Sequence, residues 1–426
     1  MQIHCFEDAV VERLRPITLA RPAYAVTSAS LRLVDWLGEL GGQLTASVRP
    51  HLRELQSLDF GLGDTPDWDD REGVLLVNAR LAPRWDTLRG LEQLAGESRS
   101  LVVTDPEEPT VVLAARIVAA DLQGPIRAAG TTEPLAAGRR IVAAAGDLPA
   151  AGPAIPDLPP LLPFRWPHDV VAAHMRDMAE SLRWRIRHGD YRQQQDGVFV
   201  GEGVRIGQYA SIHSDEHPIL LERGVSVGPF CFLEGPIYAG PGARVIEHAA
   251  IKDGVCLGHT VKIGGEVEAS VIEPFTNKQH HGFLGHSYLG SWINLGAGTC
   301  NSDLKNTYGK INMDYGDQKV ATGMQFLGCI MGDYAKTAIN TGIFTGKVIG
   351  VCSMLYGFVT SNVPSYVNYA RLFGQTSLLP PEIMVNSQRR MFERRRVEQR
   401  ECDRQLIVDM YEQTRAERAA SDQLSL

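Results

Sequence analysis

A segment rich in histidine carries the residue types that acyl-transfer chemistry needs. It runs from Thr276 to Asn306 and reads TNKQHHGFLGHSYLGSWINLGAGTCNSDLKN, with three histidines, His280, His281 and His286, within seven residues. A neutral imidazole titrates near neutral pH, so it can take a proton from an amine that attacks a thioester. The glycine-rich turn 296–299 follows, and backbone N–H groups in such a turn can hold a developing oxyanion. The segment therefore predicts acyl transfer with His286 as the base.

Charged residues on both sides of the histidines extend this prediction. Lys278 and Lys305 could hold the phosphate of a sugar phosphate, because an ammonium group is an adequate partner for phosphate, although each could also be an ordinary surface lysine. Asp303 could orient the imidazole of His286, or it could cap the turn after Asn301. Both readings stay open at this stage.

A metal site is the alternative use of the same histidines. His280 and His281 could bind zinc together with His286 or His259, since three histidines are a common catalytic zinc set. No fixed spacing supports such a set, so we predict no metal.

The composition limits the class of protein. The chain has 426 residues and a formal net charge of -8, which argues against a general binder of nucleic acids or membrane surfaces. No apolar run reaches the roughly 18 residues that span a bilayer, and the first residues do not resemble a signal peptide. The 7 cysteines are scattered without a CxxC pair, which is typical of reduced thiols. We expect a cytoplasmic protein.

A six-residue period organises the second half of the chain, over residues 191–365. An apolar residue recurs at every sixth position, often followed by glycine, and neither an α-helix nor a single strand produces that pattern. A hexapeptide β-solenoid does, with three hexads in each triangular coil and the apolar markers turned inward. The markers are Val200, Ile206, Ile212; Leu221, Val227, Leu233, Ala239, Val245, Ile251, Leu257, Ile263; Phe283, Leu289, Leu295; and Met331, Thr337, Ile343, Ile349, Leu355.

The phase of this period breaks in three places, near 213–219, near 266–282 and over 300–326. Breaks in a solenoid are where loops leave the stack, and such loops commonly build sites. Two of the three breaks flank or overlap the histidine segment. We therefore expect the site beside these loops.

The first 152 residues predict an α/β domain. Strand-like apolar runs occur at 73–77, 101–104 and 110–117, with helical patterning at 87–94, and such alternation indicates a parallel sheet covered by helices. The motif LRPITLARP lies just after the expected first strand, where open α/β sheets bind ligands. Its two arginines, Arg15 and Arg21, could hold phosphate or could be solvated.

Two further segments flank the solenoid. Residues 153–190 predict a linker and a connecting helix: six prolines in 152–167 suggest a stiff, extended and unpacked chain, and 168–187 show a helical apolar stripe. Residues 366–426 predict a helical tail, as one helix from Leu378 to Ala420. Its arginine-rich part, 389–404, is expected to be a solvated helix face, or else to contact the phosphates of a ligand of the coenzyme A type.

These motifs together resemble a known family. The runs TNKQ, HHGFLGHSYLG and NLGAGTCNSDLKN, with LRPITLARP and VNARLAP near the N-terminus, are similar to GlmU-like proteins. The family joins a uridylyltransferase for N-acetylglucosamine 1-phosphate to an acetyltransferase for glucosamine 1-phosphate. The resemblance implies a shortened, Rossmann-like nucleotidyltransferase domain and a left-handed parallel β-helix. It further implies a homotrimer with sites at subunit boundaries.

The resemblance also implies roles for single residues. His286 matches the general base, and Asn301 and Tyr288 fall where the family contacts the sugar phosphate and the acetyl group. The turn residues Ala297, Gly298 and Thr299 fall where the backbone meets acetyl-CoA. Asn301 is thus the second expected catalytic residue, and the expected substrate contacts are Lys278, Gln279, His280, Tyr288, Asp303, Lys305, Arg15 and Arg21.

The expected function is acetyl-CoA-dependent N-acetylation of an amino sugar phosphate, in synthesis of a sugar nucleotide of the UDP-N-acetylglucosamine type. Two alternatives stay open: a sugar-1-phosphate nucleotidyltransferase with the solenoid as a trimerisation scaffold, or a non-catalytic binder of sugar nucleotides. Mg²⁺ is expected only if the N-terminal domain is active. That half has no glycine-rich phosphate loop, and Asn78 stands where the family has a metal-binding aspartate.

Overall fold

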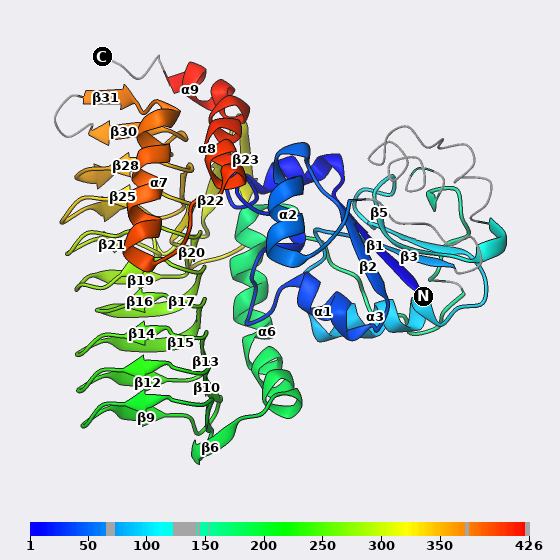
Figure 1. Cartoon of the computed structure of the whole chain (residues 1–426), viewed down its shortest axis with the longest axis horizontal. Coiled ribbons are helices and arrows are strands. Elements are labelled where there is room, and N and C mark those ends of the chain that lie inside the picture. The colour runs from blue at the N-terminus through cyan, green and yellow to red at the C-terminus, as the bar shows by residue number, and fades with distance from the viewer. Residues whose placement is uncertain (65–72, 122–142, 144, 153, 371–374, 422–426) are drawn as a thin grey trace. The chain divides into compact units, whose positions relative to one another are not determined.

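The chain folds as two compact units (Figure 1). The computed structural model describes residues 1–64, 73–121, 143, 145–152, 154–370 and 375–421. The first unit comprises Met1–Leu14, Arg21–Thr27 and Leu31–Arg165. The second comprises Arg15–Ala20, Ser28–Ser30 and Trp166–Leu426. The motif LRPITLARP is therefore divided between the two units.

The first unit is built on a five-stranded sheet in the order β2-β1-β3-β5-β4. Strand β1 is parallel to β2 and to β3, whereas β5 is antiparallel to β3 and to β4. The predicted α/β class is confirmed, but the sheet is mixed where the pattern alone predicted a parallel one, because β4 and β5 follow each other through a short connection. The strands are Gln2–Phe6 (β1), Gln43–Ser47 (β2), Val74–Asn78 (β3), Leu101–Thr104 (β4) and Val112–Ile117 (β5).

Short helices accompany this sheet. The helix predicted over 87–94 is confirmed as α3, and its leucines 88, 91 and 94 are buried at a spacing of three residues, which gives one apolar face. The described helices of this unit are Leu33–Glu39 (α1), Arg53–Phe60 (α2) and Trp85–Ala95 (α3), with 3₁₀ turns at Ala9–Leu14 (η1), Ala23–Ala25 (η2) and Pro50–Leu52 (η3).

The proline-rich segment before the solenoid packs on the first unit, so the prediction of an unpacked linker was wrong. Its described first part forms turns, and farther along the N–H of Phe164 donates to the carbonyl of Arg80 at 2.7 Å and the N–H of Ala82 donates to the carbonyl of Leu162 at 2.9 Å. Proline has no N–H to donate, and the residues between the prolines supply the contacts instead. Pro153 lies outside the described residues.

The second unit is a parallel β-solenoid, which confirms the predicted fold class (Figure 1). Its longest sheet has β27-β24-β20-β17-β15-β13-β10-β7-β6 as its main path. The strands of this sheet are Arg192–Gln195 (β6), Val198–Val200 (β7), Ser211–His213 (β9), Ile219–Leu221 (β10), Phe232–Glu234 (β12), Ile237–Ala239 (β13), Ala250–Leu257 (β15), Glu266–Ile272 (β17), Phe283–Gly285 (β19), Tyr288–Leu289 (β20), Cys329–Met331 (β24) and Lys347–Ile349 (β27).

Shorter strands form the remaining sides. One side carries Arg205–Ile206 (β8), Ser226–Val227 (β11), Arg244–Val245 (β14), Lys262–Ile263 (β16), Asn277–Lys278 (β18), Lys336–Thr337 (β25), Met354–Leu355 (β28), Val367–Ala370 (β30) and Gln375–Leu378 (β31). The other carries Cys300–Asn301 (β21), Gly342–Ile343 (β26) and Phe358–Val359 (β29). Strands β30 and β31 fall in the segment that was predicted to be a purely helical tail, so the sheet continues past residue 365.

The spacing of stacked residues shows how each coil is built. Residues at equivalent places in successive coils pair in register and form one outer row: Arg205, Ser226, Arg244, Lys262, Asn277, Asn294, Lys336, Met354 and Asn368. The successive spacings along this row are 21, 18, 18, 15, 17, 42, 18 and 14 residues. Three hexads give the regular coil of 18, and the irregular coils show where the chain departs from it.

The departures only partly match the predicted breaks. The predicted break near 213–219 corresponds to a coil that is longer than 18 residues. The predicted break over 300–326 corresponds to a long insertion, which carries the hairpin of β22 (Asn312–Tyr315) and β23 (Gln318–Ala321). The break near 266–282 is different, because Glu266–Ile272 is the continuous strand β17. The coil there is three residues shorter than the regular coil of 18, so the prediction that a loop leaves the stack at this place was wrong.

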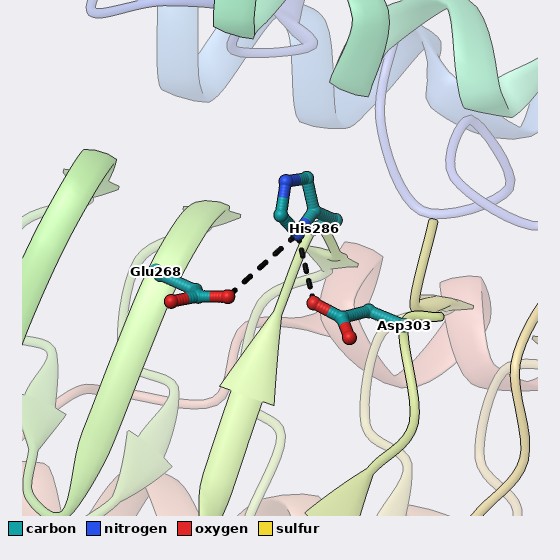
Figure 2. A group of neighbouring side chains, drawn as sticks. All are labelled: Glu268, His286 and Asp303. Atoms are coloured by element: carbon teal, nitrogen blue, oxygen red, sulfur yellow. Dashed lines mark hydrogen bonds and ion pairs between the residues drawn. The ribbon is translucent and has the colours of Figure 1, made fainter. Parts of the chain in front are cut away.

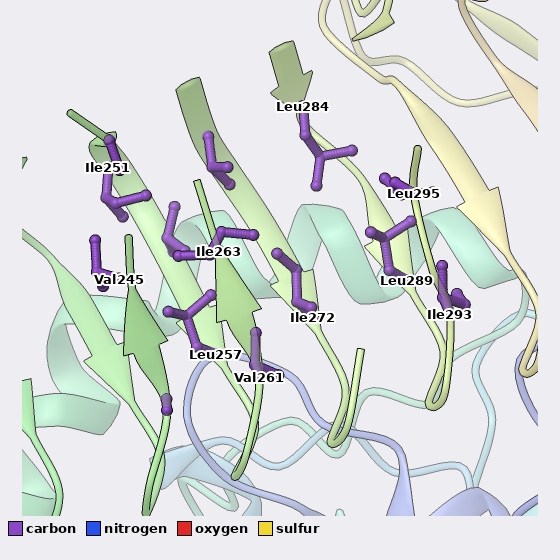
Figure 3. Packing of buried hydrophobic residues seen from close by; sticks show 14 of the residues in the cluster. Val245, Ile251, Leu257, Val261, Ile263, Ile272, Leu284, Leu289, Ile293 and Leu295 are labelled. Atoms are coloured by element: carbon purple, nitrogen blue, oxygen red, sulfur yellow. The ribbon is translucent and has the colours of Figure 1, made fainter. Parts of the chain in front are cut away.

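The inward markers form one continuous apolar column (Figure 3). Val245, Ile251, Leu257 and Ile263 are at most 3% exposed, and the same holds coil after coil. One marker was misplaced: the inward residue of β19 is Leu284, which pairs with the buried Val267. Phe283 is half-buried on the other face, because a shift of one residue reverses the sides of a strand.

Helices cover the solenoid. The connecting helix predicted over 168–187 is confirmed as α6 (Pro167–His188), whose Met178 and Leu182 pack with Leu220, Tyr238 and Cys256 of the long sheet. The tail consists of α7 (Pro381–Arg395), α8 (Glu401–Gln413) and α9 (Arg415–Ser421) where a single helix was predicted. Helix α7 ends because Arg396 has a left-handed backbone, with φ +57°. Among the described helices, none combines the length and the apolar character of a membrane span.

Lys278 occupies a place in the column that an apolar residue fills in the coil below. It pairs with the marker Ile263, its side chain is only 2% exposed, and its Nζ donates to the carbonyls of Gly264, Gly282 and His280. Burial lowers the pKa of Lys278 to about 8. The shortened coil leaves these carbonyls pointing inward, and Lys278 satisfies them, so it is a structural residue and the prediction of a substrate contact was wrong.

Because Lys278 is buried, the difference in unfolding free energy between the parent protein and the variant Lys278→Met should depend on pH. Between about pH 8 and 10.5 the unfolded chain keeps the proton on Lys278 that the folded chain has lost. The unfolding free energy of the parent, minus that of the variant, therefore rises with pH across this window, by at most about 1.4 kcal/mol per pH unit. Urea denaturation at a series of pH values measures it.

The control is Lys319→Met, which replaces an exposed lysine on β23 and should show no such pH-dependent difference. A difference for Lys278→Met that stays flat or falls across the window would contradict the buried position of this amine.

Candidate functional site

His286 stands at the end of β19 with two carboxylates beside its ring (Figure 2). Its Nδ1 lies 2.8 Å from Oδ2 of Asp303 and 4.0 Å from Oε1 of Glu268. The side chain of His286 is 18% exposed, so the ring is held by protein on one side and reaches solvent on the other. When Nδ1–H donates to Asp303, Nε2 keeps its lone pair free to accept a proton.

Two glycines make room for the side chains around His286, Gly285 for Asp303 and Gly328 for Asn301. A Cβ on Gly285 would lie 2.3 Å from Oδ2 of Asp303, and a Cβ on Gly328 would lie 2.1 Å from Nδ2 of Asn301. Both distances are too short for real atoms. His286 itself has a φ of +45°, a left-handed conformation that an ordinary residue adopts at some cost in strain. The backbone around the imidazole is thus closely constrained.

Glu268 completes the electrostatic surroundings of His286. It extends from β17, and burial raises the pKa of its carboxyl group, with the neighbouring Asp303 acting in the same direction. Lys252 of the preceding coil opposes this rise, since its Nζ lies 3.4 Å from Oε2 of Glu268. The two carboxylates therefore lie beside the ring that would carry the proton after abstraction.

Asn301 fixes the backbone on which His286 sits. Its Oδ1 accepts from the N–H of Gly285 at 2.9 Å, and its Nδ2 donates to the carbonyl of Gly285 at 3.0 Å and to the hydroxyl of Ser287 at 3.2 Å. The side chain is buried and its hydrogen bonds go to neighbours of His286. Asn301 is therefore a positioning residue, which corrects its prediction as a residue that contacts substrate.

The long insertion supplies one wall of the site. Phe326 stacks on the imidazole of His286 with ring centroids 5.2 Å apart, and it is 41% exposed. The hairpin of the same insertion is anchored to α6, because Tyr315 stacks on Trp166 and shares a hydrogen bond of 2.9 Å with His168. The insertion thus has a fixed place beside the imidazole.

The cluster could also be considered as a metal site. Glu268, His286 and Asp303 offer ligand atoms that all lie within 4.8 Å of one another. The structure does not bring His280, His281 or His259 into that group among the residues that it describes. The three-histidine zinc site is therefore unsupported, while the oriented imidazole needs no metal to act as a base.

Other predicted residues are used inside the protein. The hydroxyl of Tyr288 donates to Oε1 of Glu273 at 2.7 Å, and both residues are buried, so Tyr288 does not present itself to a substrate. The hydroxyl of Thr299 shares a hydrogen bond of 2.7 Å with that of Thr337 in the solenoid interior. The prediction of Tyr288 as a ligand contact was wrong, because the resemblance carries over the position of a residue and not its side-chain direction. The predicted contact of Thr299 concerns its backbone and stays a prediction.

The glycine-rich turn is less available than predicted. The N–H of Gly298 donates to the carbonyl of His281 at 3.0 Å, and the N–H groups of Gly296 and Thr299 also have acceptors within the fold. They do not serve as a free oxyanion hole in this arrangement. Ala297 and Gly298 are half-buried at the surface of the turn, so contact of their backbone with a ligand stays a prediction.

The remaining predicted residues lie apart from the imidazole. Gln279 lines a groove against α7, and the side chain of His280 is exposed. Arg15 donates to the backbone carbonyl of Gln413 at 3.0 Å and thus ties the chain to the end of α8. Arg21 is buried in the first unit. Lys305 stays near the surface, where its Nζ donates to the carbonyl of residue 310 at 2.8 Å.

Sequence reasoning missed Glu268 and Phe326. Glu268 alternates with Glu266 along β17, in a segment that the broken hexad phase indicated as a loop, so its strand periodicity went unnoticed. Phe326 lies in an insertion without a repeat, where no pattern links it to His286. The alternation of Glu266 and Glu268 is the one signal that could have identified a carboxylate near the base.

Comparison with known proteins gives a partial match in sequence. Residues 3–185 match the family model described as "Sugar nucleotidyl transferase". The bifunctional protein GlmU of Ralstonia nicotianae is 33% identical over 124 residues, which are 28% of this chain and 26% of that protein. GlmU of Paracoccus denitrificans is 36% identical over 89 residues, 20% of each chain. The chain thus spans about a quarter or less of the length of these relatives.

Solved structures with partial similarity include two acyltransferases. The UDP-N-acetylglucosamine acyltransferase of Arabidopsis shows 16% identity and a TM-score of 0.22, over 41% of this chain and 67% of that chain. The UDP-N-acetylglucosamine acyltransferase of Campylobacter jejuni shows 12% identity and a TM-score of 0.17, over 49% of this chain and 80% of that chain.

Proposed function

We propose that this GlmU-like chain is an acyl-CoA-dependent N-acyltransferase that acts on an amino sugar phosphate, with His286 as the general base. The observation that carries the proposal is the pairing of His286 Nδ1 with Asp303 at 2.8 Å, on a side chain that is 18% exposed. The resemblance of the motifs to the GlmU-like family implies an amino sugar phosphate of the glucosamine 1-phosphate kind and acetyl-CoA as the donor, and relatives named bifunctional protein GlmU support that resemblance.

The reaction needs one proton transfer at the imidazole. The amine of the acceptor attacks the thioester carbonyl, and His286 Nε2 takes the proton that the amine loses. The C–N bond forms, the C–S bond of the donor breaks, and the imidazolium returns its proton to the departing thiolate. Asp303 holds the ring in the correct tautomer, and together with Glu268 it stabilises the positive charge that appears on His286 during the step.

Two lysines, Lys305 and Lys347, offer a place for the phosphate of the acceptor. Burial lowers the pKa of Lys347 of β27, the carboxylate of Asp314 opposes this lowering, and the charge of Lys305 on the insertion adds to it, so the two ammonium groups are near each other with one carboxylate beside them. Two like charges held near each other favour the approach of an anion. This supports Lys305 as a phosphate contact and adds Lys347, which the sequence analysis did not single out.

The wider setting follows from the same proposal. The substrates are small molecules, an acyl-CoA and a sugar phosphate, and the product would enter synthesis of a sugar nucleotide of the UDP-N-acetylglucosamine type. A homotrimer and a cytoplasmic location stay predictions from the sequence.

Replacing His286 by asparagine tests the base directly. Asparagine tolerates the left-handed backbone at this position and cannot accept the proton, so we expect kcat to fall by about 10²-fold or more with the fold intact. Acetyl-CoA turnover with glucosamine 1-phosphate, followed by thiol release, measures this. The matched control is His281→Ala, which removes an exposed neighbouring histidine and should leave kcat within about twofold.

A chelator distinguishes the base from a metal site at the same residues. Turnover should be unchanged by EDTA, because the proposed step uses only side chains. Retention of parental turnover by the asparagine variant, or loss of turnover with EDTA and recovery with Zn²⁺, would contradict the proposal.

Nucleotidyl transfer by the first unit is the second candidate, and the match of residues 3–185 to a sugar nucleotidyl transferase model favours it. The carboxylate of Asp8, two residues after the end of β1, does not fit a magnesium ion. Both oxygens of Asp8 accept hydrogen bonds from Arg80, and Asn78 donates to the same carboxylate at 2.8 Å. Mg²⁺ prefers carboxylates that are free to bind it, so we derive no magnesium-dependent step from these residues.

Release of pyrophosphate from UTP in the presence of Mg²⁺ and sugar 1-phosphates decides this candidate. From the pairing of Asp8 with Arg80 we expect release at least 10²-fold slower than acyl transfer by the same preparation. Release that matches acyl transfer in rate, and that disappears in Asp8→Asn, would contradict this expectation and establish the first unit as a second catalytic centre.

A further inference from the structure

A groove between α7 and one side of the solenoid gathers cations that have no described acidic partner. It has a volume of about 300 Å³, within the range of small-molecule sites. Its cations are Lys262, Lys336, Arg394 and Arg395. In the described part of the chain, no ion pair joins any of these four to a carboxylate.

The solenoid side of the groove is a regular ladder. Lys262, Asn277, Asn294 and Lys336 are consecutive members of the outer row and stack in register, with Nδ2 of Asn277 donating to Oδ1 of Asn294 at 2.8 Å. Neighbouring coils lie about 4.8 Å apart, so the two lysines stand roughly 14 Å from each other along the stack. Arg244 extends the row by one coil below Lys262.

The cations on the two sides act on one another. The pKa of Lys262 is lowered by burial and by the charges of Arg395, Arg244 and Arg394. Burial also lowers the pKa of Lys336, to about 8. Like charges that face one another in a partly buried groove raise the free energy of the empty protein, and a bound anion relieves that repulsion.

Helix stabilisation accounts for only part of this arrangement. Arg394 and Arg395 lie in the last turn of α7, where positive side chains interact favourably with the helix dipole. The helix dipole does not explain why Lys262 and Lys336, which belong to the solenoid, line the same groove. The Nζ of Lys336 donates to the carbonyl of Tyr334 at 2.9 Å, and an anion that contacts both sides of the groove would give all four cations a charged partner.

The floor of the groove is apolar and adds a second requirement on the ligand. Trp292 is buried between the rings of Phe275 and Phe392, with ring centroids 4.1 Å and 4.4 Å away, and the half-buried Phe275 and Met391 give the groove its apolar surface. A bare inorganic anion would leave this floor uncovered. A molecule with phosphate groups and a planar, largely apolar ring would contact both the cations and the floor.

We propose that this groove binds the phosphorylated nucleoside part of a small molecule, with Lys262, Lys336, Arg394 and Arg395 contacting its phosphates. The same chemistry occurs in free nucleoside diphosphates and in the nucleotide end of an acyl carrier such as coenzyme A. The proposal depends on neither His286 nor the acyl-transfer step, since no residue of the groove belongs to the Glu268–His286–Asp303 cluster.

Isothermal titration of the full chain at low ionic strength tests the proposal. The probes are ADP, UDP, coenzyme A, dephospho-coenzyme A and inorganic phosphate. We expect saturable binding of at least one nucleotide, weakened by added salt because screening reduces the attraction of the cations. Preference for coenzyme A over dephospho-coenzyme A would identify the carrier end, and equal or tighter binding of ADP or UDP would identify a free nucleotide.

The variants separate the groove from general positive charge. Arg394→Gln with Arg395→Gln should weaken nucleotide binding at least tenfold, and Lys262→Gln, which leaves α7 intact, should weaken it several-fold. The matched control, Arg389→Gln with Arg390→Gln, removes two exposed charges from the same helix and should change binding by less than twofold. His286→Asn should bind like the parent, so failure of the acyl-transfer proposal leaves this result interpretable.

Three outcomes would overturn the proposal. The first is that no nucleotide binds saturably, and the second is that the groove and control variants weaken binding equally. The third is that inorganic phosphate binds as tightly as the nucleotides, which would exclude a contribution from the apolar floor.

Discussion

The packing of one apolar residue from every hexad into a single column is the constraint on which the solenoid depends. Each coil buries its markers only against the coils above and below, so a change in coil length must be absorbed locally. The regular coil has 18 residues, and the coils around His286 depart from that length in both directions. The site is built where the regular stack is interrupted, and the interruptions bring together residues from three separate places in the chain.

The short coil and the long coil contribute differently. The short coil leaves carbonyl groups turned inward, and Lys278 fills the column and satisfies them. The long coil carries the insertion that brings Asp303 and Phe326 to the imidazole. Asn301 then joins the strands on either side, so that the strained backbone of His286 is held by hydrogen bonds on both flanks. The position of the base thus depends on coils of irregular length, and the hydrogen bonds of Lys278 and Asn301 stabilise the backbone there.

The sequence predicted the solenoid well because its signal is periodic. A marker such as Leu257 is fixed by the six-residue step alone, and the structure places it in the column. The direction of a side chain near an irregular coil has no such signal. Phe283 and Leu284 exchanged roles through a slip of one residue, and Lys278 and Tyr288 were assigned to the substrate although both are buried. Glu268 was missed because the shortened coil hid the alternation of its strand. Residue type and family resemblance both indicated His286, whereas residue type alone offered Asp303, as a partner of the imidazole or as a turn cap, and the structure places its carboxylate on the ring.

The central claim is that the imidazole of His286, held by Asp303, removes the proton from the attacking amine. Chemical rescue tests it most directly, in the variant His286→Gly, because glycine accepts the positive φ and leaves a space for a free base. Acyl transfer from acetyl-CoA to glucosamine 1-phosphate is measured with increasing imidazole in the buffer. The account predicts a large loss of rate that imidazole restores in a saturable way. A variant that keeps the parental rate without imidazole would contradict it, and so would one that binds both substrates but gains no rate at any imidazole concentration.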